Sequence, residues 1–204
     1  MYRPRKYVKD DKEFILSFIK KNPFATVVMN GERLLATHLP VLIKGDEKEW
    51  ILYTHLANHN EQAELIKDGA EALIIFHGPH SYVSSSWYRE KDISTWDYSA
   101  VHVNAKVRVQ TREELEISLE KLVKHFEKDQ QEPLYYKEIP KKMVDEHLPL
   151  ITGFWLEPFL VEGVAKLHQE HPEQDVKTVT DKLENSGDCI KQKLADDIKK
   201  EHKI

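Results

Sequence analysis

The sequence predicts a mainly β fold with peripheral helices, built on an antiparallel sheet or barrel. Strand-like runs follow one another closely along the 204-residue chain and are joined by tight turns, with Asn30-Gly31 as the strongest turn signal. Helical patterns separate groups of strands and do not follow every strand, which disfavours a doubly wound parallel sheet. Neither a G-x-G-x-x-G motif nor a Walker phosphate loop occurs, which argues against Rossmann and ATP-type sites.

The first half of the chain is expected to hold one long helix and about four strands. Residues 10–23 carry apolar side chains at helical spacing, with aspartates that can cap the start and Asn22-Pro23 at the end. The further elements expected here are a hairpin over 24–43, a strand over 49–56, a short helix over 60–69 and a strand over 70–78.

The second half begins with an aromatic segment, expected to form an interrupted hairpin, and a strand over 99–110 whose valines and Ala105 share one face. A helix follows over 111–129, where Thr111 and Glu114 form a capping box. Its apolar stripe consists of Leu115, Leu119, Leu122, Val123 and Phe126. The last strand is expected over 151–169.

The C-terminal residues predict a pair of charged helices over 172–202, broken at Gly187. Such a pair is either a surface layer or an arm that binds a partner. We therefore expect a main domain over residues 1–170 and a C-terminal helical extension over residues 171–204.

Composition limits the class of protein. The net charge of −5 disfavours a stand-alone DNA reader, because neutralising phosphates requires a cationic surface. A single cysteine, Cys189, allows no disulfide framework and fits a reducing compartment. No secretory signal and no run of about 18 apolar residues occurs, so no membrane association and a cytoplasmic location are expected.

An unusual concentration of aromatic, histidine and serine residues lies between positions 78 and 107, in "GPHSYVSSSWYREKDISTWDYSAVHVNAKV". Trp and Tyr rings can stack on a planar, anionic heteroaromatic ligand while hydroxyls bind its rim or a phosphate. The same residues can instead close the end of a barrel, with the serines in turns, and buried aromatic residues more often belong to a core.

Other constellations are weaker. His55 and His59 are four residues apart, but the zinc-protease glutamate is missing, so no metal site is predicted. No serine lies in a G-x-S-x-G elbow, and no catalytic residue is predicted. Lys166 leaves the last strand after a glycine and can either meet a ligand phosphate or remain solvated.

Several motifs resemble the PaiB family of FMN-binding negative transcriptional regulators. They are "MYRP", "ATHLPVLI", "YTHLANHN", "GPHSYVSSSWY", "STWDYSAVHV" and "EGVAKLHQ", which occur in the family's order from Met1 to about Gly187. The resemblance implies that residues 1–170 form a split β-barrel of the flavin-reductase and pyridoxamine-oxidase kind. It also implies a homodimer with FMN at the subunit interface and a role in repressing protease and sporulation genes.

The resemblance also implies a set of FMN-binding residues, carried over motif by motif. They are Thr37, His38, His55, Asn58, His80, Tyr82, Ser84, Trp87, Tyr88, Thr95, Trp96, His102, Lys166 and Gln169.

The chain departs from the family pattern at two places. Asn58 replaces a usual arginine or lysine and Glu61 a usual proline, while "KLHQE" with His168 and Glu170 stands where the family commonly has "KLSQN". Because a charged hydrogen bond to phosphate is stronger than a neutral one, we expect these changes to weaken or abolish FMN binding.

Three functions therefore remain open. The first is a flavin-binding regulator without turnover, which would reach DNA only indirectly or weakly. The second is an FMN-dependent oxidoreductase, since the flavin itself carries the electron chemistry. The third is a haem-handling split-barrel protein with His80 as axial ligand.

Overall fold

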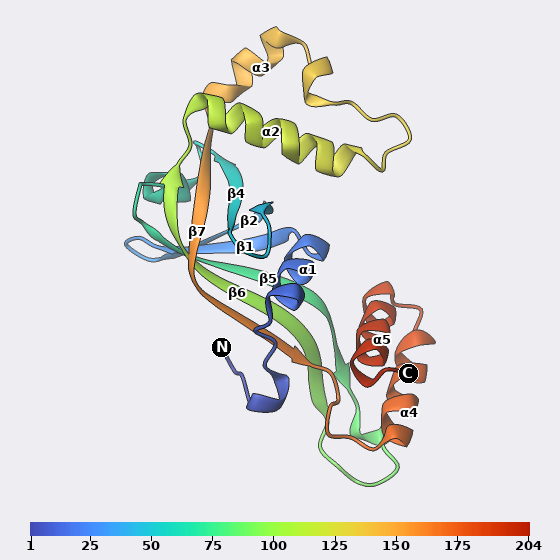
Figure 1. The fold of residues 1–204 in the computed structure, drawn as a ribbon. Coiled ribbons are helices and arrows are strands. Elements are labelled where there is room, and N and C mark those ends of the chain that lie inside the picture. The colour runs from blue at the N-terminus through green and yellow to red at the C-terminus, as the bar shows by residue number, and fades with distance from the viewer. The chain divides into compact units, whose positions relative to one another are not determined.

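The computed structural model describes residues 1–204 and is mainly β with peripheral helices, as predicted (Figure 1). Seven strands form one antiparallel sheet in the order β2-β1-β5-β6-β7-β4-β3. The strands are β1 (Phe24–Asn30), β2 (Leu34–Pro40), β3 (Leu42–Gly45), β4 (Trp50–Ala57), β5 (Glu71–Val83), β6 (Thr95–Val109) and β7 (Ile151–Lys166). The α-helices are α1 (Lys12–Lys21), α2 (Arg112–Glu127), α3 (Lys141–His147), α4 (Glu173–Glu184) and α5 (Cys189–His202). No helix is both long enough and apolar enough to cross a membrane.

The chain divides into two compact units. The terminal unit comprises Met1–Phe18, His77–His102 and Glu162–Ile204, and the central unit comprises Ile19–Phe76 and Val103–Val161. Strands β5, β6 and β7 contribute residues to both units. The expected division at residue 170 stays a prediction.

The β1–β2 hairpin of the central unit confirms the predicted pairing, with a turn longer than expected. Asn30 pairs with Leu34, so the connecting loop is Gly31–Arg33 and not the two-residue turn that Asn30-Gly31 suggested. The Gly31 N–H donates to the Arg33 carbonyl at 3.0 Å and closes this loop. The short helix expected over 60–69 is a 3-10 helix, Glu61–Leu65, capped by the Asn60 side chain.

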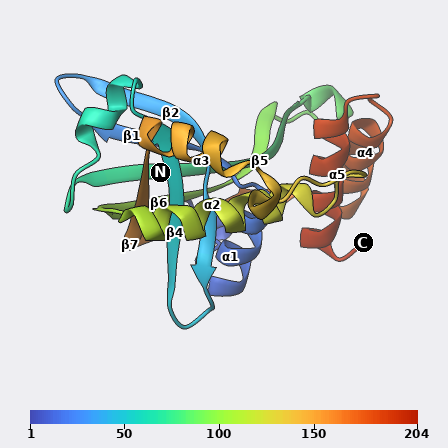
Figure 2. The ribbon, with the colours of Figure 1, turned by 90° about the horizontal axis from the view of Figure 1, so that it is seen from above.

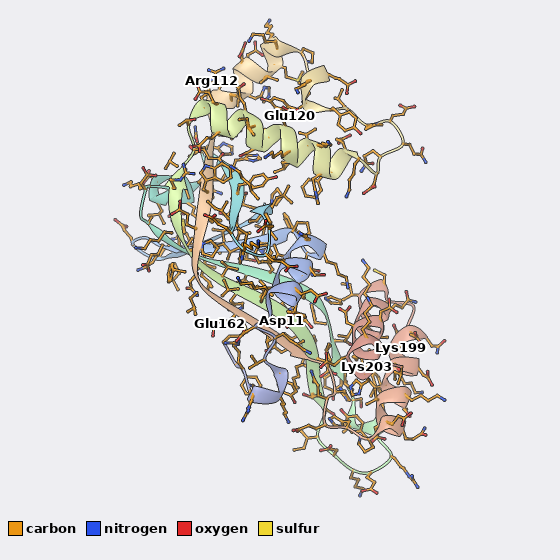
Figure 3. All side chains as sticks on the ribbon, in the orientation of Figure 1. Asp11, Arg112, Glu120, Glu162, Lys199 and Lys203 are labelled. Atoms are coloured by element: carbon orange, nitrogen blue, oxygen red, sulfur yellow. The ribbon has the colours of Figure 1, made fainter.

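Helix α2 of the central unit begins at the predicted capping box. The Thr111 hydroxyl accepts the Glu114 N–H at 3.2 Å, and the Glu114 carboxylate accepts the Thr111 N–H at 3.0 Å. The apolar stripe predicted for this helix is only partly buried: Leu115 is buried, whereas Phe126 is 39 % exposed. Arg112, marked in Figure 3, bonds Asp145 of α3 at 3.1 Å and so joins the two helices.

Helices α4 and α5 of the terminal unit lie side by side in both views (Figures 1 and 2). Gly187, at φ 73°, provides the turn between them. Their apolar faces share one buried cluster with residues of the strand ends, among them Val83, Ala165 and Leu167. The helical pair is therefore a packed layer of this unit, and its apolar face is not free for a partner.

Strands β5 and β6 are longer than predicted and carry most of the aromatic segment. Strand β5 continues to Val83, five residues past the expected end, and β6 begins at Thr95, four residues before the expected start. The interruption between them contains the 3-10 helix Ser85–Trp87. The rings of Tyr82 and Trp96 are therefore attached to rigid strands, which fixes their positions.

Candidate functional site

An outer aromatic face, defined here as His77, His80, Tyr82, Trp96 and Tyr98, lies on β5 and β6 of the terminal unit. The His80 and Trp96 rings are 5.7 Å apart and nearly parallel, at 30°. The Tyr82 and Trp96 rings are 6.4 Å apart, and His77 stacks on Tyr98 at 6.2 Å with an angle of 3°. Tyr82 and Trp96 are 49 % and 51 % exposed, so a planar ligand can reach them.

A hydrogen bond fixes the two central rings of this face. Trp96 Nε1 donates to His80 Nδ1 at 3.2 Å, so Nδ1 is the acceptor of this bond. The two ring planes are thereby held in register before any ligand arrives. A preorganised stacking surface loses little conformational entropy on binding.

An inner network, defined here as Tyr88, Asp97, His168 and His171, lies behind this face. Tyr88 Oη lies 3.0 Å from His168 Nε2, and His168 Nδ1 contacts Asp97 Oδ2. The side chains of His168 and Asp97 are 0 % and 1 % exposed. Because a carboxylate can only accept, His168 Nδ1 donates to Asp97, and Nε2 faces the Tyr88 hydroxyl.

Two rings of this network, Tyr88 and His171, have pKa values shifted toward their uncharged forms. Burial, reinforced by the nearby carboxylates of Asp97, Asp92 and Asp175, raises the pKa of Tyr88 to about 12. Burial, followed by the neighbouring His168, lowers the pKa of His171, whose ring stacks on that of His168 at 4.2 Å. Tyr88 thus stays a phenol that can donate to His168.

Lys166, at the end of β7, places its ammonium group beside the start of β6, at Thr95, Trp96 and Asp97. Its Nζ donates to the Thr95 hydroxyl and, at 3.1 Å, to the Trp96 carbonyl. Its side chain is 18 % exposed, and Asp97 Oδ1 lies 4.0 Å away. Burial lowers the pKa of Lys166, and the Asp97 charge counteracts this effect in part.

Of the remaining candidates of the terminal unit, Gln169 and Ser84 make local hydrogen bonds. Gln169 donates to the Ala165 carbonyl at 2.6 Å and accepts the Leu167 N–H at 2.8 Å, so its amide holds the end of β7. Ser84 caps the 3-10 helix by accepting the Ser86 N–H at 3.2 Å, which is the turn role that the sequence left open. Trp87 is partly buried against the core cluster, and His102 is half-buried in β6.

Four predicted residues lie in the central unit. Thr37 accepts a hydrogen bond from the Asn60 amide at 3.1 Å, and exposed His38 stacks on Phe24 at 6.0 Å. Half-buried His55 lies in β4, and burial lowers its pKa. The fourth residue is Asn58.

Asn58 uses its amide within the central unit. Its Nδ2 donates to the Pro149 carbonyl at 2.9 Å, and its Oδ1 accepts the Thr152 hydroxyl at 2.6 Å. Nearby Glu61 is paired with Arg33 at 2.5 Å, so part of its negative charge is balanced. Asn58 and Glu61, which depart from the family pattern and were expected to weaken phosphate binding, thus have partners nearby in the central unit. His168, another departure, is buried in the inner network of the terminal unit.

The structure brings His80, Tyr82 and Trp96 together on one face, with Thr95 and Lys166 joined to the same strand. It adds Asp97 and His168, which sequence reasoning did not select for the site. The period-two alternation of "STWDYS" is a signal that could have found Asp97, because an outward Trp96 and Tyr98 place Asp97 inward.

The fold is that of flavin-binding split-barrel proteins. The structure matches a FAD and haem binding protein from Mycobacterium smegmatis with a TM-score of 0.61 and 15 % identity, over 84 % of this chain and 79 % of the other. It matches the flavocytochrome Anf3 from Azotobacter vinelandii with a TM-score of 0.60 and 12 % identity, over 87 % of this chain and 78 % of the other.

Sequence comparisons identify the family. Residues 1–157 match the family described as "Putative FMN-binding domain". The chain is also 30 % identical over 197 residues to the protease synthase and sporulation protein PAI 2 of Bacillus subtilis, covering 96 % of this chain and 95 % of the relative. The chain therefore belongs to the PaiB family of FMN-binding-domain proteins, which confirms the family indicated by the motifs and supports FMN as its cofactor.

Proposed function

We propose that this protein is an FMN-binding regulator of the PaiB type that acts without turning over a substrate. The observation that carries the proposal is the outer aromatic face, where half-exposed Tyr82 and Trp96 present stacking surfaces to solvent. Isolated exposed apolar side chains are common on soluble proteins, but rings stacked in register on two adjacent strands are typical of a binding surface.

The donor set of the terminal unit suits FMN. In the proposal, Trp96 and Tyr82 contact the isoalloxazine ring, and His80 keeps Trp96 in position through its hydrogen bond. Lys166 and the Thr95 hydroxyl provide a cation and a donor for the anionic end of the ligand. When bound, the flavin supplies the electron chemistry, and these residues bind and orient it.

We further propose that two copies of the chain form a homodimer that encloses the ligand. Phe159 and Leu160 of β7 are 54 % and 49 % exposed, and large apolar side chains exposed on a strand are enriched at subunit interfaces. Light scattering coupled to gel filtration tests this point. A mass of one subunit at micromolar protein would contradict it.

The regulatory part of the proposal is supported by the printed name of the Bacillus subtilis relative, which refers to protease synthesis and sporulation. The net charge of −5 supports an indirect or weak action on DNA. A gel shift of a promoter fragment at nanomolar protein that weakens steeply with salt would contradict this indirect mode.

Titration of the full chain with FMN, followed by flavin fluorescence and by equilibrium dialysis, tests the proposal. We expect saturable binding of FMN and no oxidation of NADH or NADPH by the complex beyond that of free FMN. Absence of FMN binding would contradict the proposed function. Rapid reduction of the bound flavin by either nucleotide would instead support the FMN-dependent oxidoreductase.

A further inference from the structure

The two carboxylate oxygens of Asp97 have different surroundings. Oδ2 contacts His168 Nδ1, whereas Oδ1 is buried and has no hydrogen-bond partner. Oδ1 lies 4.0 Å from Lys166 Nζ, which is within ion-pair range but too long for a hydrogen bond. The charge of Asp97 therefore acts on Lys166 without anchoring its ammonium group.

Internal groups use only part of the hydrogen-bonding capacity of Lys166. An ammonium group has three N–H donors, and two of those on Lys166 bond Thr95 and the Trp96 carbonyl. The third can point toward Asp97 or toward an anionic group of a ligand. A phosphate that approaches Lys166 thus meets a cation whose charge is already balanced.

The inner network keeps this negative charge in place. His168 holds Asp97 Oδ2 from one side and is itself held by the Tyr88 hydroxyl at 3.0 Å, so the carboxylate cannot rotate away without breaking a buried bond. Because Asp97 is removed from water, its field is screened less than that of a surface carboxylate.

We propose that Asp97 determines ligand specificity by reducing the preference of this site for a phosphorylated flavin over riboflavin. The inference rests on the proposed function and identifies a positioning residue that acts through Lys166. FMN and riboflavin share the same ring system, so the ratio of their dissociation constants isolates the contribution of the phosphate. The account predicts that this ratio depends on the charge at position 97.

The experiment compares the full chain with its Asp97→Asn variant, titrated with FMN and with riboflavin. Asparagine keeps the shape of the side chain and an acceptor for His168 while removing the charge. We expect the preference for FMN over riboflavin to rise roughly threefold to tenfold, as a unit charge several ångströms from a phosphate implies. An unchanged or reduced preference would overturn the inference.

A matched control is Asp175→Asn, because Asp175 is also buried, at 8 % exposure, but accepts the Arg89 N–H at 2.9 Å. This variant should change the preference by less than about twofold, since no ion pair joins Asp175 to Lys166. If the preference for FMN over riboflavin rose equally in both variants, the cause would be a general loss of negative charge and not the position of Asp97 beside Lys166.

A second variant covers the case in which Asp97→Asn does not fold, as judged by circular dichroism and gel filtration. His168→Ser removes the imidazole that restrains Asp97, so the carboxylate can approach Lys166 and the preference for FMN should fall. An unchanged ratio there would overturn the inference. If the wild-type chain binds neither flavin, the proposed function fails with it; if it binds both and Asp97→Asn leaves the ratio unaltered, only the present inference fails.

Discussion

The two sides of β6 in the terminal unit carry opposite chemistry at consecutive positions. Trp96 is 51 % exposed and belongs to a stack of rings, whereas Asp97 is 0 % exposed and belongs to a network of charged and polar groups. Strand alternation alone produces this separation, because successive side chains point to opposite faces. The outer side can contact a ligand, and the inner side, shielded from water, can set the charge that the ligand meets.

The largest expected effect is a loss of folding stability when Asp97, on the inner side of β6, is replaced. Asp97→Ala removes the partner of both His168 and Lys166, and breaking such a buried pair typically lowers the free energy of unfolding by about 3 kcal/mol or more. Urea unfolding followed by circular dichroism measures this loss. The control is Asp92→Ala, an exposed carboxylate in the loop that precedes β6, for which a change below about 0.5 kcal/mol is expected. Equal losses in the two variants would contradict the role of the inner network.

On the outer side, Trp96→Ala should affect binding more than stability. Loss of one stacking ring costs about 1–3 kcal/mol of binding free energy, so FMN affinity should fall roughly tenfold to a hundredfold. A matched control is Phe126→Ala on α2, another exposed ring, which should leave the affinity unchanged. Similar affinities of the wild-type chain and Trp96→Ala would place the flavin elsewhere.

A smaller effect is expected when the inner hydrogen bond is removed without disturbing the packing. Tyr88→Phe leaves His168 Nε2 without its donor and should lower the free energy of unfolding by about 1 kcal/mol. The control is Tyr98→Phe on the outer face, where no hydrogen bond to a buried group is lost. If Tyr98→Phe proved the more destabilising of the two, the division between the sides of β6 would be wrong.

The pH dependence of the free energy of unfolding involves His171 of the inner network and His102, which lies half-buried on β6. Burial lowers the pKa of both below the usual value of 6.5, so both rings are neutral in the folded chain at neutral pH. The unfolded chain binds more protons as the pH falls through 6.5, and the free energy of unfolding should therefore decrease from there toward lower pH. Histidine ring resonances followed by NMR measure both pKa values; a value above 6.5 for either would contradict this expectation.

Local patterns predicted much of the fold. The Thr111–Glu114 capping box, the β1–β2 pairing and the break at Gly187 depend on neighbours in sequence, and the structure contains all three. Strand β5 runs past its expected end at residue 78, although Gly78 and Pro79 are residue types typical of turns. Long-range pairing maintained this strand against its local propensity.

The candidate site was also predictable only in part, because only some of its residues are indicated by local sequence patterns. Aromatic composition indicated Tyr82 and Trp96, and the structure exposes both rings. The contact between Asp97 and His168 joins residues 71 positions apart, so no local pattern indicated it. His168 was interpreted only as a departure from the family motif, because its partners become apparent only when β6, β7 and the segment around Tyr88 are placed together.

A crystal structure of the chain grown with FMN would show where the flavin binds. We expect the isoalloxazine ring to stack against Trp96 and Tyr82, with an anionic group directed toward Lys166. An FMN molecule bound away from these rings, or crystals in which Trp96 and Tyr82 pack only against protein while FMN is present in excess, would contradict it.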